Sequence, residues 1–151
     1  MLRNAEILDA LETVMGEAFP DCTIYRNLVR RNFQRPSLLV ETGRQTMEDA
    51  TRYAVDRTAQ AKVTFFETVD DYHDTQVEVL EARLSAGMLL LSQGALPAGD
   101  RYLDVSGVAG ESFNDYAELT FTLSWQDDRE LAGGDAALLE NIDITVLSGG
   151  R

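Results

Sequence analysis

The side chains best suited to acid–base or metal chemistry lie in DDYHD, residues 70–74. This stretch holds the chain's only histidine, His73, among Asp70, Asp71 and Asp74. A histidine beside carboxylates can form a general acid–base pair or a metal site. Side chains this close in sequence mostly point in different directions around a turn, and acids in a first helical turn favour the positive end of the helix dipole. We therefore interpret the stretch as a helix start.

The single cysteine, Cys22, lies within AFPDCTIYRN, residues 18–27. A reactive thiolate needs a nearby cation to lower its pKa, and the nearest in sequence is Arg26. One cysteine excludes an internal disulfide and a zinc site built from several thiolates. Phosphate-loop, dinucleotide, zinc-protease and nucleophile-elbow motifs are absent from the sequence. We interpret Cys22 as a packing residue, and expect no catalytic residue, metal or cofactor.

The elements that would position these residues follow from hydrophobic periodicity. Ile7, Leu11, Val14 and Ala18 recur at helical spacing, and the proline after Phe19 ends that helix. Alternation and β-branched residues predict strands elsewhere. The expected elements are helices at 3–18 and 71–92, strands at 23–26 and 37–43, extended pieces at 48–56 and 59–69, a hairpin over 101–126 turning at 110–114, a helical turn at 136–141 and a strand at 142–147.

This order predicts one α+β domain over residues 1–151. We expect a mainly antiparallel β-sheet with two α-helices packed on one face, plus an extended β-arm or hairpin, and a frayed tail at 148–151. The second helix has an apolar stripe of Val77, Leu80, Leu84, Met88 and Leu91.

The formal net charge of −13 argues against a direct grip on nucleic acid or an anionic membrane surface. No stretch approaches the roughly 20 apolar residues that span a bilayer. The N-terminal MLRNAEILDALE is amphipathic and acidic, unlike a signal peptide. We therefore expect a soluble protein made inside a cell.

Positive charge concentrates in one stretch of this acidic chain, at Arg26, Arg30, Arg31 and Arg35. Such a patch could seat nucleic acid, could favour head-to-tail association of copies, or could be a solvated loop. Three aromatic residues near expected loops are further contact candidates, with packing onto their own sheet as the alternative. They are Tyr53, Phe113 and Tyr116.

Two stretches, EAFPDCTIY at residues 17–25 and FQRPSLLVE at residues 33–41, resemble the opening of the phage and prophage tail terminator proteins. In that family a first helix ends in phenylalanine and proline, Ile-Tyr follows, and a loop ending in Arg-Pro leads into a hydrophobic strand. A β-arm, an FFE-like strand, a second helix and a hairpin come next. The matching pieces here are Phe19–Tyr25, Pro36–Glu41, Val63–Glu67, 72–92 and 101–126. Region 44–61 is more alanine-rich and less aromatic than the family's arm.

The resemblance implies a structural protein of the virion tail, assembled in the host cytoplasm, without catalytic residues. It implies a ring, commonly a hexamer, on the head-proximal end of the tail tube, which stops tube polymerisation and docks the head connector. The isolated protein could be monomeric. DNA would pass through without specific binding, and acids lining the channel or its rims would repel phosphates. Our candidates are Glu48, Asp49, Asp56, Asp104, Glu111 and Asp115, with the arginines and the aromatic candidates at a subunit or tube interface.

Other interpretations stay open at this point. A different head–tail connector or tail-completion ring could share the same α+β layer. A small acidic binding module would also fit the composition, and a hydrolase would use His73 and its neighbouring acids.

Overall fold

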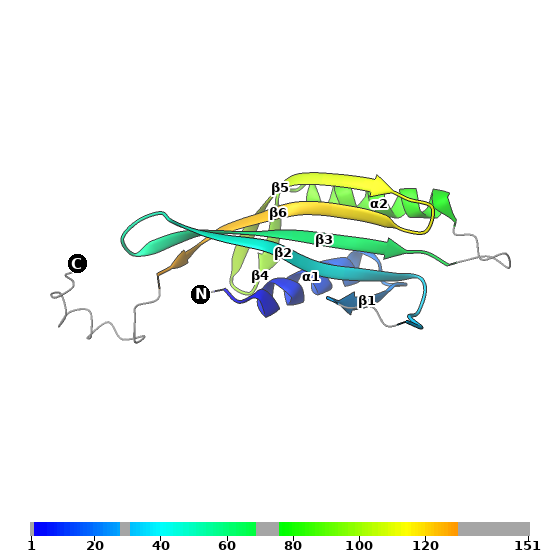
Figure 1. Ribbon diagram of the computed structural model, residues 1–151, viewed down its shortest axis with the longest axis horizontal. Coiled ribbons are helices and arrows are strands. Elements are labelled where there is room, and N and C mark those ends of the chain that lie inside the picture. The colour runs from blue at the N-terminus through cyan, green and yellow to red at the C-terminus, as the bar shows by residue number, and fades with distance from the viewer. Residues whose placement is uncertain (1, 28–30, 69–75, 130–151) are drawn as a thin grey trace.

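The computed structural model describes residues 2–27, 31–68 and 76–129 (Figure 1). Its elements, in chain order, are α1 (Asn4–Ala18), β1 (Thr23–Arg26), β2 (Ser37–Asp49), β3 (Ala54–Phe66), α2 (Val77–Leu91), β4 (Ala95–Ala98), β5 (Arg101–Ser112) and β6 (Ala117–Asp128). The predicted helical turn at 136–141, the strand at 142–147, the tail and the start of the second helix at 71–75 lie outside the described residues.

The described strands form one six-stranded sheet in the order β1-β2-β3-β6-β5-β4. β1 runs parallel to β2, and the other neighbours are antiparallel. Buried side chains alternate along β3 and β6, so Val63, Phe65 and Leu119 face the helices while the intervening residues face away. Both helices pack on this one face, and the predicted α+β class is confirmed.

Helix α1 buries Ile7, Leu8, Leu11 and Met15 against the sheet. The predicted stripe is right at Ile7 and Leu11, but Ala18 is exposed. Phe19 then leaves the helix and meets Phe65 edge to face, with ring centroids 5.3 Å apart. The helix end is therefore fixed by a core aromatic contact as well as by the proline that follows.

Helix α2 buries Leu80, Leu84, Gly87 and Leu91. Two residues of the predicted stripe, Val77 and Met88, are 38% and 36% exposed instead. The helix can sit this close because Gly87 has no side chain.

A Cβ at Gly87 would lie 2.9 Å from Leu119 Cδ2 and 3.3 Å from Phe65 Cζ. The closest approach is therefore to side chains of the sheet. The glycine's use is to bring α2 down onto this apolar surface.

Strands β2 and β3 form a long hairpin that projects past both helices (Figure 1). The predicted extended piece over 48–56 is wrong, because the chain reverses at 50–53 and places Glu48 opposite Asp56. This hairpin is the predicted β-arm, and we call its turn at 50–53, with the residues beside it, the arm tip. Strand β6 runs along the arm as far as Ala54. Alternation alone cannot locate this turn, since both sides of it are polar and extended.

Strand β4 was not predicted, since Pro97 and the following Ala-Gly-Asp indicated a break. Its four residues pair with Arg101–Asp104 at the sheet edge, where a proline is tolerated because one side needs no partner. The turn between β5 and β6 covers 113–116, later than the expected 110–114.

Candidate assembly surfaces

The face of the sheet opposite the helices is polar, and neither of the described helices covers it. Strand register places the hydroxyls of Thr46, Thr58, Thr120, Thr122 and Ser124 on it. Its acids by register are Glu41, Glu48, Asp56, Asp104, Glu111, Glu118 and Asp128. We call this surface the open face; it is rich in hydroxyls and carboxylates.

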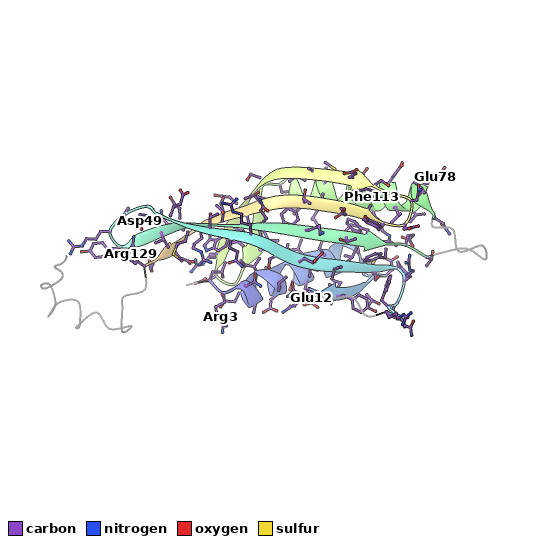
Figure 2. All side chains as sticks on the ribbon, viewed as in Figure 1. Arg3, Glu12, Asp49, Glu78, Phe113 and Arg129 are labelled. Carbon is purple, nitrogen blue, oxygen red and sulfur yellow. The ribbon has the colours of Figure 1, made fainter. Side chains whose placement is uncertain are left out.

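Four of the six candidate acids share the open face: Glu48, Asp56, Asp104 and Glu111. The other two do not. Asp49 lies near the arm tip, where its carboxylate is 2.6 Å from Arg129 Nη2 (Figure 2), and Asp115 lies in the β5–β6 turn.

The candidates omitted Glu41, Glu118 and Asp128, which also lie on the open face. The alternation of TFTLSW could have found Glu118, because it lies two residues before Thr120 on the same side of the strand.

The chain's only lysine stands among these acids. Lys62 Nζ lies 3.3 Å from Glu118 and 3.7 Å from Glu41. The hydrogen bond to Glu118 raises the pKa of Lys62 above its usual value, against the opposing effect of burial. Lys62 and Glu41 border a hollow that is also lined by Gly43 and Gly107. The carboxylates of Glu41 on β2 and Glu118 on β6 thus neutralise Lys62. The remaining acids leave the open face with a net negative charge.

The predicted arginine patch is divided between two faces. Arg26 turns to the helix side and pairs with Asp9 and Glu12 of α1. Arg35 is half-buried on the other side, and its Nη1 donates to the backbone oxygen of Glu67. Arg31 is exposed. Arg30 lies outside the described residues.

A cluster of aromatic rings lies around Arg35 at one end of the open face. The Arg35 guanidinium stacks over Phe33, 4.7 Å from the ring centroid, and lies 5.7 Å from Phe66. Phe66 leads on to Tyr116 at 6.4 Å, and Tyr116 stacks on Phe113 at 4.7 Å. We call these residues the aromatic cluster. Three of the residues that we predict as contact residues, Arg35, Phe113 and Tyr116, lie in this cluster, and each is partly buried. Their role in a contact stays a prediction.

Tyr53 lies apart from the aromatic cluster, at the arm tip, and is 68% exposed. Its backbone oxygen accepts a hydrogen bond from the Arg129 N–H at 2.8 Å. Figure 2 shows Arg129 and Asp49 at this tip and Phe113 at the opposite end of the molecule. The two groups of predicted interface residues are therefore separated by the length of the sheet.

The chemistry-bearing residues give no assembled reaction site in the described chain. His73 and its neighbouring aspartates lie outside the described residues. Within residues 2–27, 31–68 and 76–129, no group of three or more histidine, cysteine or acidic side chains is placed to hold a metal ion. Burial raises the pKa of the Cys22 thiol to about 11, with the carboxylates of Asp21 and Glu67 adding to the rise. Such a thiol is a poor nucleophile at neutral pH.

Comparison with protein families decides the identity of the chain. The family model described as phage tail terminator protein matches residues 6–133, which include every described strand, α2, and α1 from Glu6 onward. The chain belongs to the phage tail terminator family. No curated protein matches it significantly.

Membership of the phage tail terminator family makes the protein a structural component of phage tail assembly. Its place is the virion tail, and its partners are other tail or head proteins. Members of this family are structural, and enzymatic activity is not expected of them. In the described part of the chain, neither helix has the length and apolar character needed to cross a bilayer.

Proposed function

We propose that this tail terminator forms a ring, a hexamer in the family's common form, on the head-proximal end of the tail tube. The ring stops tube polymerisation and offers its far side to the head connector. Copies that meet head to tail form a closed ring when the rotation between them closes. The aromatic cluster and the arm tip are two separate candidate surfaces for contacts of this kind.

The open face carries this proposal. In the ring it faces the channel or its rims, with Glu48, Asp56, Asp104 and Glu111 as the acids nearest the passing DNA. A channel lined with arginine or lysine would bind DNA phosphates and release counterions, and so would retain the genome. Carboxylates repel the phosphates, and uncharged hydroxyls add no charge attraction, so DNA can slide through.

The aromatic cluster and Arg31 are proposed to contact the neighbouring subunit or the tube. Arginine over aromatic rings is a common composition for the centre of a protein interface. Arg26 is less suited to this role, since Asp9 and Glu12 of its own chain already satisfy it.

Electron microscopy of the protein with its tail tubes tests the proposal. The expected result is a single ring at one end of each tube and no further growth when tube subunits are added. Tubes that continue to grow, or protein bound along their sides, would contradict it. The protein alone is a useful companion sample, because the ring could require the tube end to close.

An Arg31→Glu change tests whether Arg31 lies in the subunit or tube interface. We expect it to lower the mass in solution at high concentration, or to prevent capping, whereas Glu78→Arg on the exposed start of α2 should change neither. Unchanged assembly in the Arg31 variant would remove this residue from the interface.

A further inference from the structure

An apolar groove lies on the helix side of the molecule, at the C-terminal ends of both helices. It is lined by Val14 and Ala18 of α1, Leu90 at the end of α2, and Leu96 and Pro97 of the edge strand β4. Glu17 stands at its wall. β4 is the last strand of the described sheet, and its residues Ala95, Leu96 and Pro97 line the groove. The groove is therefore an apolar surface beside the terminal strand of the described sheet.

The groove is also electronegative. Helices α1 and α2 both end beside it, and neither has a basic residue in its last turn. The last carbonyl groups of a helix carry a partial negative charge that a nearby cation stabilises. Glu17 adds a full negative charge at the same place. A matching partner would present apolar side chains together with positive charge.

The arm tip has this composition. Met47 and Tyr53 are 53% and 68% exposed, and the Arg52 guanidinium lies 5.6 Å from the Tyr53 ring centroid. Arg52 has no carboxylate partner among the described residues, whereas most described arginines are in ion pairs. The exposed acids beside the tip, Glu48 and Asp56, lie on the open face, whereas Met47 lies on the helix side of the arm. Exposed apolar side chains beside the unpaired Arg52 form a tip that complements an acidic apolar groove.

The tip cannot reach the groove of its own chain. The arm projects beyond the N-terminal end of α1, and the groove lies at the C-terminal end of that helix (Figure 1). The arm is stiffened by β6 on one side and by Arg129, which holds the backbone oxygens of Arg52 and Tyr53. Any contact between tip and groove must therefore join two copies.

We propose that the arm tip of one subunit docks into the helix-end groove of the next subunit. Met47 and Tyr53 cover the apolar wall, and Arg52 lies against Glu17 and the helix ends. The contact uses different surfaces on the two copies, so repetition of it produces a closed ring or a filament. This inference rests on the proposed ring and names the surfaces that connect its subunits.

Disulfide trapping tests the contact directly. In a Cys22→Ser background, one preparation carries Tyr53→Cys and a second carries Ala18→Cys. After mixing and mild oxidation, alone and with tail tubes, we expect a disulfide-linked pair of the two variants. Glu78→Cys replaces Ala18→Cys in the matched control and should give no pair. Absence of the arm–groove pair in both samples would overturn the proposal, as would equal yield with the control.

A charge exchange gives a second readout. Arg52→Glu and Glu17→Arg should each weaken self-association about tenfold or more, the effect of removing an interface anchor. The two changes together in one chain should restore it, because every contact would again join opposite charges. A double variant weaker than either single one would contradict the pairing. Sedimentation equilibrium measures all three.

The outcomes also separate this contact from the capping role. A cross-linked ring that fails to stop tube growth would leave the arm contact intact and remove the capping function. A cap that stops growth without an arm–groove cross-link would keep the function and assign the groove to another partner, such as the tube protein.

Discussion

The carboxylate of Asp127 accepts a hydrogen bond from the backbone N–H of Leu2, at 3.2 Å to Oδ2, across 125 positions of sequence. The same carboxylate receives the Trp125 indole N–H at 2.9 Å, Arg101 at 2.6 Å and Arg57 at 3.2 Å. Its side chain is fully buried. This group joins the N-terminus to the arm, where Asp127 of β6 pairs with Val55 of β3.

Asp127→Ala should lower the free energy of unfolding by about 3 kcal/mol. The change removes the acceptor of the largely buried Arg57 guanidinium and of the N–H groups of Leu2 and Trp125. Asp128→Ala, at the exposed neighbouring position, should stay within about 0.5 kcal/mol of wild type. Urea denaturation of the three proteins measures the difference. Equal stability of both variants would show that the buried network contributes nothing net.

Acid should weaken the fold through the same group. Burial opposes ionisation of Asp127, but hydrogen bonds from Trp125, Arg101 and Leu2 outweigh it and hold its pKa below the usual 3.8. The unfolded chain therefore binds this proton more readily, and the contribution is present above pH 3.8 and lost as the pH falls through the folded-state pKa. The Asp127→Ala variant should lose less stability than wild type on acidification below that value, and urea midpoints across the range will show it.

Gly87→Val should destabilise the protein by about 2 kcal/mol, because a Cβ at this position meets Leu119 and Phe65 in a packed core. Ala86→Val, on the exposed side of the same helix, carries the same β-branched side chain and should cost only a few tenths of a kcal/mol in helix propensity. Thermal unfolding of both variants separates the core clash from propensity. A similar melting temperature for the two would mean that α2 can move away from the sheet.

Cys22 should react slowly with iodoacetamide. With a pKa of about 11, roughly one thiol in a thousand is ionised at pH 8. The rate should rise with pH up to that value, and denaturant should raise it many-fold at pH 8 by restoring an ordinary thiol. Rapid labelling of the native protein at neutral pH would contradict the packing role.

Charge reversal on the open face should create DNA binding. Glu48→Lys, Asp104→Lys and Glu111→Lys together replace three carboxylates on one surface, and the variant should retain DNA with an affinity that falls steeply as salt rises. A control with Glu78→Lys and Glu81→Lys changes exposed acids of α2 on the other side of the sheet and should bind much less. Gel mobility at two salt concentrations compares them. Equal binding by both would remove the open face from any role in excluding DNA.

Local sequence patterns are enough to predict the elements whose side-chain period is strong. The helix over residues 4–18, the strand at 23–26 and the alternating strand from Ala117 were all predicted close to their limits, because burial on one face imposes its period on the local sequence. The same patterns gave the α+β class and, with the two quoted motifs, the family.

The remaining features of the fold depend on contacts between residues that lie far apart in the sequence. The turn at 50–53 depends on β6 and Arg129, which come from the far end of the described chain. Strand β4 exists because β5 offers an edge, despite its proline. The four arginines of the patch are close in sequence but not in the fold. Arg26 pairs with carboxylates of α1, while Arg35 stacks on an aromatic ring on the opposite face. Strand register placed four candidate acids on one surface, and no local pattern contains that register, because pairing partners far apart in sequence set it.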